Sequence, residues 1–200
     1  MLDGKLRALA DPLLTVLARH AGRHAGADAV SAIGLCFGLT GAGLIAAGWP
    51  GLALAGLALS RLCDGLDGAI ARQKQATDRG GYVDIVFDFI FYGAWPLAFA
   101  CADPAANALA AAGLLFAFHV NGASFLAFAA LAAKRGMGEG ARGPKSLYFT
   151  AGLAEGAETI AVFAAMCLWP QHFSALALGY AGLCLATAAS RIGLAWRVFA

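Results

Sequence analysis

The segment Asp64–Asp88, DGLDGAIARQKQATDRGGYVDIVFD, decides the fold of this chain. It contains two pairs of aspartates next to apolar sequence, Asp64 with Asp67 and Asp84 with Asp88. Spacings of three and four residues put each pair on one face of a predicted helix. The polar residues between the pairs turn the chain back, so the pairs can meet. Four carboxylates this close repel one another unless a cation lies between them.

The ligand chemistry of this segment favours a hard divalent cation. Carboxylate oxygens without His or Cys suit Mg²⁺ or Mn²⁺. The alternative is that the carboxylates only cap helix ends. The high cost of placing carboxylates near a membrane core argues against that interpretation.

The composition of the whole chain is that of a membrane protein. Hydrophobic residues make up 60% of the 200 residues and charged residues 13%. A soluble domain carries about a quarter charged residues. We therefore expect an integral membrane protein with a single membrane domain. The net formal charge of +2 gives no reason to expect a nucleic-acid partner.

Residues 1–25 are predicted to form an amphipathic helix that lies in the membrane interface, on the cytoplasmic leaflet. Leucines recur there at near-helical spacing, with basic residues between and after them. These are Leu2, Leu6, Leu9, Leu13, Leu14 and Leu17. An unanchored tail is the alternative.

Residues 26–200 are predicted to form an all-α membrane domain of six transmembrane helices, each close to the roughly 20 residues needed to span. The predicted spans are residues 30–48, 51–71, 82–101, 106–133, 147–168 and 173–194. The second span carries the first aspartate pair and the third carries the second pair. The glycines of the first span, Gly34, Gly38, Gly41 and Gly43, are interpreted as helix-packing positions.

The positive charges predict the orientation of this domain. Every Lys and Arg outside the spans falls on one side of the six-span arrangement. Arg61 is the exception, because it lies inside the second span, one turn before Asp64. The positive-inside rule then puts both termini and the carboxylate site on the cytoplasmic side.

Eight positions of the chain match the pattern DxxDGxxARx(7–8)GxxxDxxxD. They are Asp64, Asp67, Gly68, Ala71, Arg72, Gly80, Asp84 and Asp88. This resembles the signature of the CDP-alcohol phosphatidyltransferase family. The resemblance implies a multi-pass enzyme of a bacterial inner membrane, typically a homodimer among membrane lipids. Such an enzyme transfers the phosphatidyl group of a CDP-linked lipid, such as CDP-diacylglycerol, to a small alcohol and releases CMP in phospholipid biosynthesis.

The resemblance also implies roles for the aspartates. Asp64, Asp67 and Asp84 would hold a first Mg²⁺ or Mn²⁺ ion, and Asp64, Asp84 and Asp88 a second. Asp88 would also be the catalytic general base that removes the proton of the acceptor hydroxyl.

For the CDP-lipid, Gly68 lets the nucleotide approach the backbone, and Arg72 fits the pyrophosphate as a planar cation. Thr77, before Gly80, matches a family position that helps to bind the CDP part. The turn before the first span that touches the cytidine is matched by Gly26, Ala27, Asp28 and Ala29. Asp28 could equally be the N-cap of that span.

The acceptor is less well defined. Candidate residues are Lys134, Arg142, Lys145, Glu155, Glu158 and Arg191. In relatives that use inositol phosphate the corresponding stretch resembles E-R-P-E-R, and its arginines grip the phosphate. Here residues 155–159 read EGAET, without the arginines. This favours a small polar or amino alcohol near Glu155 or Glu158.

Two interpretations of the acceptor candidates remain open beside that one. The membrane topology alone can explain the cations, and the two glutamates can pair with Arg61, Arg142 or Arg191 to brace the bundle.

Two other functions remain open as well. The same motif serves enzymes that transfer from a soluble CDP-alcohol, such as CDP-choline, to diacylglycerol. A protein of another class, a small cation transporter or channel, could line its path with carboxylates. Arg72 at the mouth of such a path argues against it.

Overall fold

The computed structural model describes residues 14–20, 22, 25–74, 77–137 and 156–200. Within these ranges the chain is helical and contains no strand. The long helices are α2 (Ala27–Ala46), α3 (Pro50–Lys74), α4 (Asp78–Ala102), α5 (Pro104–Lys134), α7 (Gly156–Leu168) and α8 (Phe173–Val198). A short 3₁₀ turn, η1 (Pro170–His172), precedes α8. The predicted all-α class is confirmed.

The six-span prediction is supported for four helices. In the described ranges, α2, α4, α5 and the continuous segment Pro170–Val198 are long and apolar enough to cross a membrane. Helix α3, with 25 residues, is long enough to cross a membrane, but charged residues interrupt its apolar sequence. Helix α7 has 13 residues, and residues 147–155 of the predicted fifth span lie outside the described ranges.

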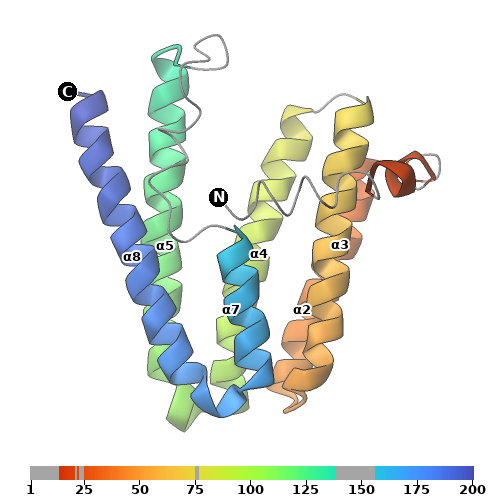
Figure 1. The fold of residues 1–200 in the computed structure, drawn as a ribbon, viewed down its shortest axis with the longest axis vertical. Helices are drawn as coiled ribbons and strands as arrows, with labels where there is room; N and C mark the ends of the chain where they lie inside the picture. Colours follow the sequence, from red (N-terminus) through yellow and green to blue (C-terminus); the bar gives the residue numbers. More distant parts are fainter. Residues whose placement is uncertain (1–13, 21, 23–24, 75–76, 138–155) are drawn as a thin grey trace.

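The helices form one bundle in which α2 packs along both α3 and α4. Beyond α4 the order continues with α5 and then α8, while α7 contacts α3 and α8 (Figure 1). The turns that join α2 to α3, α4 to α5 and α7 to α8 lie at the same end of the bundle, at the bottom of Figure 1. The end of α3 and the start of α4, which carry the signature residues, lie toward the opposite end.

Local sequence explains where several helices begin and end. Thr77 is the N-cap of α4, and its Oγ1 accepts a hydrogen bond from Gly80 N at 3.1 Å. Asp103 caps α5 in the same way, and Pro104 follows at the first helical position. Both are favoured N-terminal arrangements. Gly48, with a φ of +86°, adopts the left-handed conformation just after α2 ends.

Glycines let α2 approach its two neighbours closely. A Cβ atom at Gly34 would lie 2.8 Å from Cys63 Cβ on α3, and one at Gly38 would lie 2.5 Å from the Phe91 ring on α4. Gly41 is similarly close to both helices. The packing interpretation is confirmed for these three residues. It is not supported for Gly43, because no other helix among the described residues comes within 4 Å of its Cβ position.

An aromatic cluster joins α4 to α7 in the core. The rings of Trp95 and Phe163 stack with centroids 5.3 Å apart. Phe91 packs beside them, with its centroid 5.6 Å from that of Trp95. Trp95 Nε1 donates a hydrogen bond to Gly38 O at 3.3 Å, so the buried indole N–H has a partner on α2. The cluster therefore fixes α4 between α2 and α7.

The predicted N-terminal helix is described only in part. Residues 14–20 are helical, and Ala18 is buried against Ile70 of α3. Gln73 Nε2 donates to Thr15 O at 3.2 Å, and Lys74 Nζ donates to Gly22 O. The end of α3 therefore holds this segment. Residues 1–13 lie outside the described ranges, and a position in the membrane interface stays a prediction.

Candidate functional site

All four signature aspartates line one pocket, whose walls come from three helices. The residues of the pocket are Ser31, Gly34, Leu35, Ser60, Arg61, Asp64, Asp67, Asp84, Phe87, Asp88 and Phe91. The sequence predicted that α3 and α4 would bring the two aspartate pairs together, and the structure agrees. It did not predict the third wall, which α2 supplies by packing along both carboxylate helices.

Asp67 is the most buried of the four aspartates, with 7% of its surface exposed. The Ser31 hydroxyl of α2 donates a hydrogen bond to Asp67 Oδ2. Ser31 Oγ also lies 3.1 Å from Ala27 O, one turn earlier on α2. Ser31 therefore fixes the orientation of Asp67. Sequence reasoning missed it, although a hydroxyl in an apolar helix is a common sign of a hydrogen bond between helices.

Arg61 lies inside the pocket, between the two aspartate pairs. Its Nη1 is 3.6 Å from Asp64 Oδ2 on α3 and 3.6 Å from Asp88 Oδ1 on α4. The guanidinium carbon lies 4.4 Å from the centroid of the Phe91 ring, within the range of a cation–π contact. The sequence marked Arg61 as a charge within a span and as a possible partner of Glu155 and Glu158, and not as a residue of the carboxylate site. That position, one turn before Asp64, was the available signal of a site residue.

The donor atoms of the pocket fit a hard divalent cation. They are carboxylate and hydroxyl oxygens, and no imidazole or thiol lines the pocket. In the described part of the chain, however, no three His, Cys, Asp or Glu side chains converge closely enough to enclose one ion. Arg61 lies between Asp64 and Asp88 instead. The structure thus gathers the expected ligand set without the geometry of a bound ion.

Gly68 and Arg72 lie one turn apart on α3, outside the pocket lining. Apart from the adjacent residues and the backbone of α3, the described atom nearest to a Cβ at Gly68 would be Arg72 Nη1, at 3.4 Å. The backbone at Gly68 is therefore open on the side where the Arg72 guanidinium lies, which suits an anionic group that contacts both.

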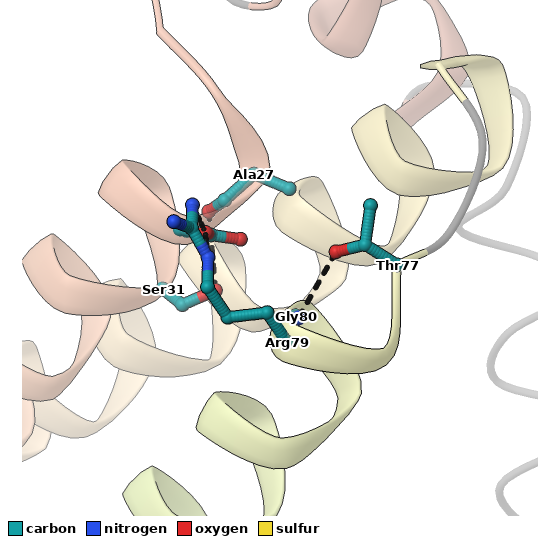
Figure 2. Close-up of polar contacts among 6 residues, drawn as sticks. Ala27, Ser31, Thr77, Arg79 and Gly80 are labelled. Atoms are coloured by element: carbon teal, nitrogen blue, oxygen red, sulfur yellow. Dashed lines mark hydrogen bonds and ion pairs between the residues drawn. The ribbon is translucent and has the colours of Figure 1, made fainter.

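The two segments expected to contact the nucleotide lie side by side at the N-terminal ends of α2 and α4. Figure 2 shows Arg79, next to the Thr77 cap, reaching the turn that contains Ala27 and Ser31. There Arg79 Nε donates to Asp28 Oδ2 at 3.0 Å, and Nη2 contacts the same oxygen. The predicted N-cap role of Asp28 is wrong, because Gly26 is the N-cap of α2 and Asp28 lies in its first turn.

The acceptor candidates are described only in part. Arg142, Lys145 and Glu155 lie outside the described residues. Lys134 is exposed in the last turn of α5. Arg191 on α8 donates from Nη1 to Asn121 O at 3.1 Å, to Asn121 Oδ1 at 3.0 Å and to Ser124 Oγ at 2.7 Å. Arg191 therefore joins α8 to α5 and does not line the carboxylate pocket.

Glu158 lies in the first turn of α7. Its Oε2 is buried and has no hydrogen-bond partner among the described residues. Within these residues it forms no ion pair with Arg61 or Arg191, which have the other partners given above. Bracing of the bundle by either of these two pairs is therefore wrong.

The fold and the pocket define a helical membrane protein with a carboxylate site between its helices. A sequence model of the CDP-alcohol phosphatidyltransferase family matches residues 25–191. The chain is also similar to the inner membrane protein YnjF of Escherichia coli K12. The two are 42% identical over 193 residues, which cover 96% of this chain and 94% of the relative. No solved structure matches it. The chain belongs to the CDP-alcohol phosphatidyltransferase family.

Proposed function

We propose that this protein transfers the phosphatidyl group of CDP-diacylglycerol to the hydroxyl of a small polar alcohol in phospholipid biosynthesis. The acceptor oxygen forms a bond to the phosphatidyl phosphorus. The bond from that phosphorus to the bridging oxygen of the pyrophosphate breaks, and CMP leaves. The observation that carries this proposal is that all four signature aspartates of a family member line one pocket.

The aspartates have distinct roles in this reaction. We propose that Asp64, Asp67 and Asp84 hold one divalent ion and that Asp64, Asp84 and Asp88 hold another. Mg²⁺ or Mn²⁺ bound there would neutralise the pyrophosphate and stabilise the charge of the displacement. Asp88 takes the proton from the acceptor hydroxyl. Its side chain is 33% exposed, so an acceptor can reach it from the pocket.

The nucleotide part binds toward the N-terminal ends of α2 and α4. The support is that the segments at Asp28 and Thr77 are neighbours there, although they are far apart in the sequence. Helix N-terminal ends favour phosphate groups. Arg72, beside the open backbone of Gly68, binds the pyrophosphate. With the nucleotide at this end, we also propose that the pocket and both termini face the cytoplasm.

The acceptor is a small polar or amino alcohol without a phosphate. The stretch Glu155–Thr159 lacks the arginines expected for a phosphorylated acceptor. Arg191, a remaining candidate for phosphate binding, already donates three hydrogen bonds to α5 from one nitrogen. Glu158 has a buried carboxylate oxygen without a described partner, which suits a hydroxyl or an ammonium group.

The test is an assay of the purified protein in lipid with Mg²⁺ or Mn²⁺. CDP-diacylglycerol is supplied with serine, inositol, glycerol 3-phosphate or inositol phosphate. CMP release and the lipid product are measured. We expect product with one acceptor and a loss of about a hundredfold or more in Asp88→Asn, because the general base is removed. The matched control is Asp103→Asn, at the opposite end of the bundle (Figure 1), where Asn can also cap α5, and it should retain activity.

The outcomes of this assay separate the alternatives. Product from CDP-choline and diacylglycerol, with none from CDP-diacylglycerol, would reverse the assignment of donor and acceptor. A folded protein that binds no CDP compound would contradict the enzyme proposal itself.

A further inference from the structure

The carboxylate pocket already contains a cation, the guanidinium of Arg61. Arg61 Nη1 lies at the same distance, 3.6 Å, from Asp64 Oδ2 and from Asp88 Oδ1. These two aspartates belong to different helices, α3 and α4, each of which packs along α2. Arg61 therefore bridges the α3 and α4 sides of the pocket.

Contacts other than the two aspartates also hold Arg61 in place. The guanidinium lies 4.4 Å from the centroid of the Phe91 ring, and Nη2 donates to Ser60 Oγ at 3.3 Å. The side chain is only 22% exposed, and its Nε is buried without a partner among the described residues. A charge in such surroundings needs opposite charges close by, and Asp64 and Asp88 provide them.

The same two carboxylates are those that a divalent ion would use. Asp64 and Asp88 are shared by the proposed ligand set, and oxygen ligands of Mg²⁺ lie about 2.0–2.1 Å from the ion. A guanidinium this close to both carboxylates competes for their negative charge with a divalent ion bound by both, and the two cations repel each other. The contacts of Arg61 with Phe91 and Ser60 do not involve the aspartates. Arg61 can therefore keep these contacts when Asp64 and Asp88 bind an ion.

We infer that Arg61 is a positioning residue that competes with the divalent ion for Asp64 and Asp88. In the metal-free protein it holds the two carboxylates of α3 and α4 together, and it releases them as the ion binds. This inference rests on the proposed function, because it requires a divalent-ion site at these aspartates. It predicts that Arg61 stabilises the metal-free protein and weakens ion binding.

The test compares the wild-type protein with Arg61→Met, whose side chain keeps an apolar stem against Phe91. Free Mn²⁺ is measured by electron paramagnetic resonance during a titration, and the thermal unfolding midpoint is measured in EDTA and in saturating Mn²⁺. We expect Arg61→Met to bind Mn²⁺ about tenfold more tightly, because the competing state of the site is gone. In EDTA it should unfold at a lower temperature than wild type, and Mn²⁺ should reduce that difference.

Two further variants complete the design. Arg61→Lys keeps a charge without the planar fork of arginine, so its Mn²⁺ affinity should lie between those of wild type and Arg61→Met. If Arg61→Met fails to fold, Arg61→Lys alone decides the question. Arg191→Met removes another partly buried arginine, on α8, and should leave the Mn²⁺ affinity within about twofold.

The outcomes distinguish this inference from the proposed function. Mn²⁺ binding that is lost in Asp84→Asn but is unchanged or weaker in Arg61→Met would overturn the role of Arg61 and leave the metal site standing. If neither wild type nor Arg61→Met binds Mn²⁺, the metal site and the role of Arg61 both fall.

Discussion

Arg61 on α3 and Arg191 on α8 occupy similar surroundings in two regions of the bundle. Each guanidinium lies over a phenylalanine ring, 4.4 Å from the centroid of Phe91 and 5.6 Å from that of Phe125. Each has a buried Nε without a hydrogen-bond partner among the described residues. The two arginines differ in what their Nη1 atoms contact.

Arg61 is held by carboxylates and Arg191 by neutral oxygens. The partners of Arg61 are Asp64 and Asp88, on two different helices. Those of Arg191 are oxygens of Asn121 and Ser124, both on α5. A carboxylate can exchange an arginine for another cation, whereas an amide and a hydroxyl hold a divalent ion far less well. The comparison teaches that the same residue type fastens α8 to α5 in one region and lies between two carboxylates in the other.

The largest effect on stability is expected from Gly38→Ala, which disturbs the support of Arg61. The new methyl group would lie 2.5 Å from Phe91 Cδ2 and 3.2 Å from Ser60 Oγ, and both residues contact Arg61. Overpacking of this kind costs about 1–3 kcal/mol. Equilibrium unfolding in detergent measures it. Gly43→Ala, on the same helix in open space, is the control, and equal stability of the two variants would contradict the prediction.

A smaller loss of stability is expected from Arg191→Met, which removes a contact between α8 and α5. It removes three hydrogen bonds to α5. At about 0.6 kcal/mol for each hydrogen bond within a membrane protein, the loss is about 1–2 kcal/mol. The loss should be the same with and without Mn²⁺, unlike that of Arg61→Met. The same unfolding measurement tests it, with the exposed Arg197→Met as the matched control. A Mn²⁺-dependent loss would remove the contrast between the two arginines.

The smallest effect on stability is expected at the ion pair of Asp28 and Arg79. This pair is an exposed counterpart to the partly buried contacts of Arg61 and Arg191. The Arg79 side chain is 80% exposed, so water and salt screen the pair. A double-mutant cycle with Asp28→Asn and Arg79→Met should give a coupling of about 0.2–1 kcal/mol that decreases with added salt. A larger coupling that salt does not change would mean that this pair fastens α2 to α4 as firmly as a buried one.

Much of the fold and part of the site could be predicted from the sequence. Apolar segments of spanning length predicted an all-helical membrane protein, because a chain in lipid must satisfy its backbone groups internally. The spacing of the signature predicted that its aspartates share one pocket and identified the family. The close packing of Gly34, Gly38 and Gly41 followed from their position in a span. The sequence could not separate Gly43 from them, because a glycine has no side chain whose character would indicate the face it occupies.

Only the tertiary structure decided which groups meet between helices. Spacing along one helix defines its faces, but the rotation of that helix against its neighbours depends on side-chain packing over the whole bundle. For this reason the sequence marked Arg61 as a charge within a span and did not predict its position between Asp64 and Asp88. For the same reason it missed the hydrogen bond from Ser31 to Asp67 and the contact between Arg79 and Asp28, for which it had weighed only a nucleotide contact and a helix cap. The sequence by itself determined the membrane fold, the family and the four carboxylates, because these depend on residue types at fixed spacing. Packing between α2, α3 and α4 decided which cation lies among those carboxylates.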